Sequence, residues 1–333
     1  MTLEEIVKEV DQKKFRPIYL LMGDEPYYID RLCDYIQSKV LSEEERSFNE
    51  YILYGKDVGA VEIDNVARRF PMMAPHQLVL VKEAQLIKKI EDLVHYAGQP
   101  QPTTVLILAH KYKSIPKNRK LYKAIEKNGV VFESKKLYDS QIPEWVTSYL
   151  RKRKWQIDPA SAQLIAENLG NDLSKISNEL DKLLLVSNSG QQLVTPELIQ
   201  SNIGISKDYN TFELQKALGT RQELKAYRIV QYFASNQKEH PFVLSISSLY
   251  AYFSKLLLLH FSKDKSPRNL ASVLGINPYF VNEYLVAAKN YSPRKVVEII
   301  HLLREYDLKS KGVDANATEP GELLRELIFK ILN

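Results

Sequence analysis

The residues best placed for chemistry follow the first apolar run, residues 17–22, which ends at Gly23 before an expected helix. A glycine between a strand and a helix is the setting of a phosphate-binding loop, G-x-x-x-x-G-K-[ST]. In that motif backbone N–H groups wrap the phosphates, the lysine neutralises charge and the hydroxyl holds Mg²⁺. Counted from Gly23, the second glycine, the lysine and the hydroxyl are replaced by Tyr28, Ile29 and Asp30. The motif is degenerate.

The surrounding residues also disfavour a nucleotide. Pro26 removes a backbone N–H, and Asp24 and Glu25 would repel phosphate. The apolar run 78–81 is followed by Lys82, where a nucleotide site needs a Mg²⁺-binding aspartate. We therefore expect no bound nucleotide and no other cofactor.

The sequence shows no motif for other kinds of enzyme chemistry. The six histidines are scattered, a second cysteine to pair with Cys33 is lacking, and neither H-E-x-x-H nor G-x-S-x-G occurs. We expect no metal site and no catalytic residue. Cys33 lies in a helical pattern and is interpreted as an inert packed thiol. A single unpaired cysteine, no signal peptide and no long apolar run together indicate a cytoplasmic protein.

Charge is concentrated in one part of the chain. Residues 1–100 carry a net charge of −5, residues 101–154 a net charge of +9 and residues 155–333 a net charge of +1. A concentration of cations of this kind is typical of proteins that contact phosphate backbones. For any single group of neighbouring lysines and arginines, the alternative is that it only solvates the surface of a helix.

Five of these cations follow an apolar run, residues 103–109, and so belong to the carboxyl end of a predicted strand. Ligands of parallel sheets collect at that edge. We therefore predict DNA contacts by Lys111, Lys113, Lys117, Arg119 and Lys120.

Strand and helix patterns alternate through the first part of the chain. Strands are predicted at 17–22, 48–54, 77–81, 103–109 and 130–133, and helices from Pro26, over 58–69, from Ala84 to about Tyr96 and over 117–127. This alternation predicts an α/β domain with a parallel sheet that is covered on both faces.

Beyond residue 137 the patterns are helical. A capping residue followed by proline begins helices at Asp158, Thr195, Ser266, Asn277 and Ser292, and Asn171 is predicted to cap a helix over 172–186. Residues 242–261 are apolar on nearly every face and are expected at the centre of a bundle. The chain is divided into an α/β domain (1–139), a small helical domain (140–208) and a C-terminal helical domain (209–333).

Three segments together resemble a known family. They read P-I-Y-L-L-M-G-D-E-P-Y-Y-I-D (17–30), F-P-M-M-A-P-H-Q-L-V-L-V (70–81) and L-G-N-D-L-S-K-I-S-N-E-L-D-K-L (169–183). In this order and spacing, and with this three-domain layout, the chain resembles the delta subunit of the bacterial DNA polymerase III clamp loader.

The resemblance implies an AAA+-like fold without ATPase activity, followed by a lid domain and a collar domain. Such a chain would bind and open the sliding clamp (the beta subunit) during DNA replication. Its other partners would be the gamma/tau and delta prime subunits, reached through the C-terminal domain, and primed DNA. It would be a non-catalytic component of the DNA polymerase III holoenzyme in the cytoplasmic, nucleoid-associated replisome, with no membrane partner.

The family's clamp-binding element corresponds here to Phe70, Pro71, Met72 and Met73. Pro71 stops the preceding helix, and three large apolar side chains in four residues cannot all face one helix stripe. A projecting apolar tip of this kind marks a partner site, and methionine adapts to irregular pockets. The alternative is that these side chains pack in the domain's own core.

Two other functions remain open at the level of sequence. An active AAA+ ATPase would require nucleotide binding, which the replacements at Tyr28, Ile29 and Asp30 disfavour. A stand-alone DNA-binding protein would bind DNA without partners, and the even charge of residues 155–333 gives it little support.

Overall fold

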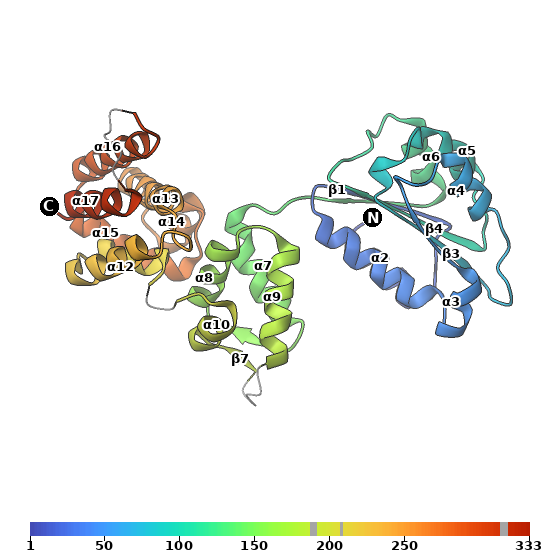
Figure 1. Ribbon diagram of the computed structural model, residues 1–333, viewed down its shortest axis with the longest axis horizontal. Helices are drawn as coiled ribbons and strands as arrows, with labels where there is room; N and C mark the ends of the chain where they lie inside the picture. The colour runs from blue at the N-terminus through green and yellow to red at the C-terminus, as the bar shows by residue number, and fades with distance from the viewer. Residues whose placement is uncertain (187–191, 207–208, 314–318) are drawn as a thin grey trace. The chain divides into compact units, whose positions relative to one another are not determined.

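A computed structural model describes residues 1–186, 192–206, 209–313 and 319–333. The chain divides into two compact units, residues 1–137 and 138–333, and each is described separately (Figure 1).

The first unit is built on a five-stranded sheet in the order β2-β3-β4-β1-β5, in which every neighbouring pair is parallel. This confirms the predicted α/β class. Its elements are α1 (Leu3–Asp11), β1 (Ile18–Gly23), α2 (Pro26–Val40), α3 (Glu43–Asn49), β2 (Glu50–Tyr54), α4 (Ala60–Ala67), β3 (Gln77–Lys82), η1 (Ala84–Leu86), η2 (Ile90–Leu93), α5 (Val94–Gly98), β4 (Thr104–Lys111), α6 (Lys120–Asn128) and β5 (Val130–Ser134).

Helices cover both faces of this sheet, with α1 and α2 on one face and α4, α5 and α6 on the other (Figure 1). Successive residues of a strand point to opposite faces, so the continuously apolar strands β1, β3 and β4 supply two cores at once. Cys33 of α2 lies in the core on its side of the sheet, and burial raises the pKa of its thiol to about 12, as suits a packed, unreactive cysteine.

Two local predictions in this unit are wrong. Residues 48 and 49, expected to begin a strand, end α3, which starts at a capping box between Ser42 and Glu45. The helix predicted from Ala84 to about Tyr96 is instead two short 3₁₀ turns followed by α5. Glu83 and Lys89 adopt left-handed backbone conformations, which a continuous helix does not allow.

The second unit is helical. Its elements are η3 (Asp139–Gln141), α7 (Ile142–Arg151), β6 (Gln156–Ile157), α8 (Pro159–Leu169), α9 (Leu173–Val186), β7 (Leu193–Val194), α10 (Pro196–Ile203), α11 (Thr211–Gly219), α12 (Glu223–Ser235), α13 (Phe242–Phe261), α14 (Pro267–Leu274), η4 (Pro278–Phe280), α15 (Val281–Asn290), α16 (Pro293–Ser310) and α17 (Pro320–Leu332). The parallel pair β6–β7 contradicts the expectation that no strand follows residue 137.

The predicted helix starts are confirmed at all five cap–proline pairs, although the one at Asn277 begins a 3₁₀ turn. The cap predicted at Asn171 is wrong, because Asp172 accepts the backbone N–H of Lys175 in that role. Asn171 donates to Asp139 instead. The sequence also predicts a polar turn at 187–192 and a linker at 203–209, and part of each lies outside the described residues.

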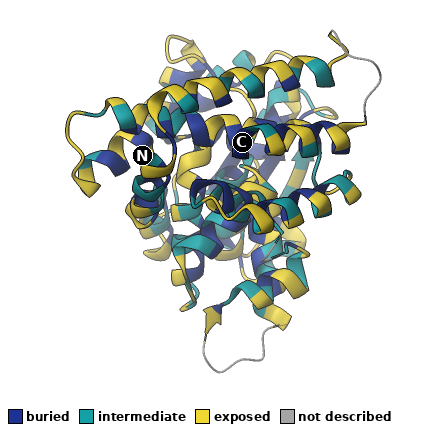
Figure 2. Cartoon of the chain, turned by 90° about the vertical axis from the view of Figure 1, so that its left-hand side faces the viewer, coloured by how far each residue is buried: buried dark blue, intermediate teal, exposed yellow. Residues whose placement is uncertain are grey.

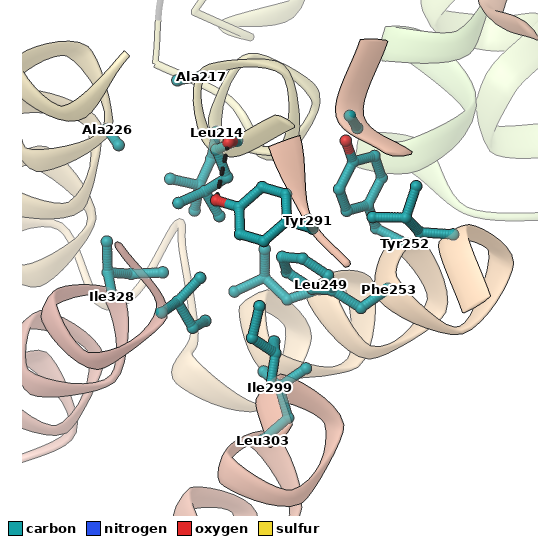
Figure 3. Close-up of a cluster of buried hydrophobic side chains, with 14 of the residues drawn as sticks. Leu214, Ala217, Ala226, Leu249, Tyr252, Phe253, Tyr291, Ile299, Leu303 and Ile328 are labelled. Atoms are coloured by element: carbon teal, nitrogen blue, oxygen red, sulfur yellow. Dashed lines mark hydrogen bonds between the residues drawn. The ribbon is translucent and has the colours of Figure 1, made fainter. Parts of the chain in front are cut away.

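One large core occupies the C-terminal part of this unit, and all of its members come from residues 214–332. Tyr291 lies at its centre beside Phe253 and donates a hydrogen bond of 2.9 Å to the Leu218 carbonyl (Figure 3). Burial raises the pKa of Tyr291 to about 12, because the phenolate would lose its hydration in this apolar surrounding.

The helix α13 is long and apolar enough to cross a membrane by length and composition alone. It packs instead against α11, α14, α15, α16 and α17, as expected for a central bundle helix. The prediction that it is buried on nearly every side is wrong for one face, where Val243, Leu244 and Tyr250 are exposed. Figure 2 shows the same division of helices into buried and exposed faces.

Candidate functional site

The loop after β1 is closed by the chain's own groups. Gly23 has φ +128°, and a Cβ there would lie 2.0 Å from the Ser134 carbonyl oxygen, so only glycine fits this approach to β5. The Asp24 N–H donates to the same carbonyl at 3.1 Å, and the Glu25 N–H donates to the Ser134 hydroxyl at 3.3 Å. These contacts fasten the loop to β5.

An internal carboxylate occupies the start of α2. Glu25 is buried and caps this helix, and its Oε1 accepts the backbone N–H of Tyr27 at 3.1 Å. Pro26 fills the first helical position and offers no N–H. Helix N-termini attract anions, and a bound nucleotide would place a phosphate there. In this chain a glutamate already supplies the negative charge.

The three residues that replace the motif are used structurally. Ile29, at the position of the lysine, is fully buried in the core between the sheet and α2, and Tyr28 packs at the border of that core. Asp30, at the position of the hydroxyl, forms an ion pair with Lys111, whose Nζ lies 2.6 Å from Oδ1. The pair joins α2 to the end of β4.

The predicted basic residues lie at the carboxyl edge of the sheet, on and after β4. Lys111 is engaged with Asp30, whereas Lys113, Lys117, Arg119 and Lys120 are exposed. Arg119 is 4.0 Å from Glu91, at the limit of an ion pair. Buried Ile115 anchors the loop, and its N–H lies 3.3 Å from the Met22 sulfur.

The tip segment (residues 70–73) lies at the opposite, amino edge of the sheet, because it precedes β3 in an all-parallel arrangement. Phe70 is 77% exposed, Met72 is 61% exposed and Met73 is fully exposed. These side chains are therefore not part of the domain's core. Three large apolar side chains thus lie in solvent within four residues.

Two buried amides fix the ends of the tip segment. Gln77 Nε2 donates to the Arg69 carbonyl at 2.6 Å, and the Asn49 side chain bonds both backbone polar groups of Met72. Sequence reasoning missed both residues. The S-x-x-E pattern at Ser42 would have revealed α3 and hence the helical setting of Asn49, but no pattern indicated its contact with Met72.

Two protein-family models match parts of this chain. The family model of the DNA polymerase III delta subunit matches residues 19–135, and the model of that protein's C-terminal domain matches residues 208–325. The chain belongs to the DNA polymerase III delta subunit family. The family resemblance drawn from the sequence is thereby confirmed.

Two relatives extend this result. The chain is 24% identical to the DNA polymerase III subunit delta of Bacillus subtilis over 323 residues, covering 92% of this chain and 91% of the relative. The solved structure of the Bacillus subtilis DNA clamp loader delta protein matches with a TM-score of 0.52 and 22% identity, covering 99% of each chain. The second comparison agrees with the predicted fold class, an α/β domain followed by a helical part.

Proposed function

We propose that this chain binds the sliding clamp through the tip segment and opens it without ATP hydrolysis of its own. The observation that carries the proposal is the exposure of Phe70, Met72 and Met73 on a backbone that is fixed by buried amides. An apolar tip on a rigid support suits insertion into an apolar pocket of a partner, where a few anchors supply most of the binding energy.

Opening then follows from differential affinity. A protein that binds an open ring better than a closed one shifts the ring towards opening by the difference in binding free energy. A hundredfold preference supplies about 2.8 kcal/mol, at 1.4 kcal/mol per tenfold. This step breaks no covalent bond, and ATP bound by neighbouring subunits would control access to the tip.

The absence of nucleotide chemistry in this subunit is part of the proposal. It is supported by the Glu25 carboxylate at the start of α2, by the burial of Ile29 and by the Asp30–Lys111 pair. A phosphate at the start of α2 would be repelled by the Glu25 carboxylate. Lys111 would attract it only weakly, because that lysine already pairs with Asp30.

Contacts with the gamma/tau and delta prime subunits are proposed for residues 209–333, the collar domain, with residues 140–208 as the lid. The exposed apolar face of α13 supports this assignment. It borders a groove of about 640 Å³ between α13 and α16, lined by residues that include Val243, Tyr250 and Val297. A solvent-facing apolar groove of this kind is suited to packing against another helical domain.

DNA contact by Lys113, Lys117, Arg119 and Lys120 is proposed only within the assembled loader. These cations lie at the sheet edge opposite the tip segment, so one domain could engage the clamp and DNA with different surfaces. Lys111 stays a predicted member of this set, although its ammonium group also pairs with Asp30.

The experiment is to mix the isolated full chain with the cognate clamp in the absence of nucleotide. Binding is measured by calorimetry, and opening by fluorophores that flank the interface between the clamp's protomers. We expect tight binding and separation of the fluorophores. Failure to bind the clamp, or opening only after ATP is added to these two proteins, would overturn the proposal.

A further inference from the structure

Asn49 is a buried polar residue next to the most exposed apolar segment of the first unit. It is the last residue of α3 and is 1% exposed, whereas its neighbour Phe48 is largely exposed. Because β2 begins at the next residue, Asn49 lies at the amino edge of the sheet, beside the strand that the tip segment precedes.

The side-chain amide of Asn49 bonds one residue of the tip segment twice. Its Oδ1 accepts the Met72 N–H at 2.6 Å, and its Nδ2 donates to the Met72 carbonyl at 3.0 Å. Nδ2 also donates to the Glu45 carbonyl at 3.0 Å, one turn earlier in α3. A primary amide presents an acceptor and a donor side by side, as this pairing requires, and a carboxylate or a hydroxyl does not.

The tip segment has little else to hold its shape. Its large side chains face solvent, so they supply few packing contacts, and Met73 has φ +54°, in the left-handed region that a methionine rarely adopts. A strained, exposed backbone persists only where its surroundings impose it. Gln77 fixes the preceding Arg69 carbonyl, and Asn49 fixes Met72 directly before the strained residue.

We propose that Asn49 is a positioning residue for clamp binding, which holds residues 70–73 in the conformation that enters the clamp. The inference rests on the proposed function of the tip segment and adds a residue that itself need not touch the clamp. Without the Asn49 amide the segment samples other conformations. The apparent affinity for the clamp then falls in proportion to the fraction of chains that remain in the binding conformation. We expect Asn49→Ala to weaken clamp binding about ten- to fifty-fold.

The control is Asn128→Ala. Asn128 is an amide of the same unit that also spans distant segments, with Nδ2 donating to the Ala97 carbonyl at 2.8 Å and to the Gly98 carbonyl at 3.2 Å. Both variants lose hydrogen bonds to backbone carbonyls, but only Asn49 contacts the tip segment. We expect Asn128→Ala to change clamp affinity less than about twofold. Its melting temperature should fall less than that of Asn49→Ala, because Asn128 is only partly buried and makes two of these bonds where Asn49 makes three.

Two further measurements separate positioning from general stability. Hydrogen exchange of the Met72 amide, which needs no clamp, is expected to be slow in the wild type and fast in Asn49→Ala. Asn49→Asp keeps the size of the side chain but cannot donate to the Met72 carbonyl, so it is expected to weaken binding as well. This isosteric variant provides the test if the alanine variant does not fold.

A double-mutant cycle decides the mechanism. Once Met72→Ala and Met73→Ala remove the two anchors beside the Asn49 contact, adding Asn49→Ala should reduce affinity by less than about threefold, because only Phe70 is left to position. Wild-type affinity of a folded Asn49 variant, or an undiminished loss in the Met-deficient background, would overturn the inference. If the two Met substitutions alone leave binding intact, the proposed clamp contact itself fails, and this inference fails with it.

Discussion

Replacing Met72 and Met73 together by alanine tests the clamp-binding surface most directly. Full burial of a methionine side chain contributes about 1.5–3 kcal/mol. Met73 is fully exposed and Met72 is 61% exposed, so most of their apolar surface is available to a partner. We expect the double variant to lose roughly 3–5 kcal/mol of binding free energy, which is a few hundred- to a few thousand-fold in affinity.

The same exposure predicts that the fold is retained. Truncating a side chain that makes few internal contacts leaves no cavity, so the melting temperature should change by less than about 2 °C. If these methionines belonged to the core, the same change would lower the melting temperature by several degrees.

Clamp affinity by titration calorimetry and thermal unfolding by circular dichroism are measured on each variant. Leu185→Ala, which truncates an 83% exposed apolar side chain of α9 in the second unit, is the matched control and should alter neither quantity appreciably. Normal clamp affinity in the methionine variant, or a destabilised fold, would refute the assignment of residues 70–73 as the clamp contact.

The remaining predictions concern nucleotide, DNA and alkaline pH. Calorimetric titration with Mg-ATP should detect no binding to the isolated chain, because the Glu25 carboxylate occupies the start of α2 and the motif's lysine and hydroxyl are replaced by Ile29 and Asp30. Micromolar binding would contradict this. In the assembled loader, replacing Lys113, Lys117 and Lys120 by glutamate should weaken DNA binding. The slope of the logarithm of the binding constant against the logarithm of salt concentration should become shallower by up to about 0.9 per lost phosphate contact. An unchanged slope would mean that these lysines only solvate the surface. Burial raises the pKa of Tyr291 to about 12, whereas an unfolded tyrosine ionises near 10, so the unfolded chain releases this proton first and stability falls as the pH rises from about 10 to 12. Tyr291→Phe should therefore flatten the loss of stability between pH 10 and 12 by up to about 1.4 kcal/mol per pH unit, measured by urea unfolding, and an equally steep loss in the variant would contradict this explanation.

Features that depend on neighbouring residues could be predicted from the sequence alone. Continuous apolar runs indicated β1, β3 and β4, because a strand that is covered on both faces must be apolar throughout. Cap–proline pairs located helix starts for the same local reason. The loss of a phosphate-binding motif could be read from Tyr28, Ile29 and Asp30 alone, since the motif is defined by residue type and spacing.

Local patterns failed where a short element had competing signals. Phe48 and Asn49 adjoin the alternating residues of β2, and this pattern extended the predicted strand into α3. Left-handed residues at Glu83 and Lys89 interrupted an otherwise helical pattern without any glycine to indicate the breaks. The exposed face of α13 carries the same apolar residue types as its buried face, so composition could not distinguish them.

The contacts that hold the site join residues that are far apart in the chain and meet only in the folded protein. The sheet places Lys111, one of the predicted DNA contacts, against Asp30, 81 residues away in the chain. The amide of Asn49 reaches Met72 across 23 residues because β2 and β3 are neighbours. Whether residues 70–73 lie in the core or in solvent was likewise open from sequence, since an apolar side chain suits both. Strand pairing and packing bring distant residues together, and residue type and spacing along the chain do not encode those contacts directly.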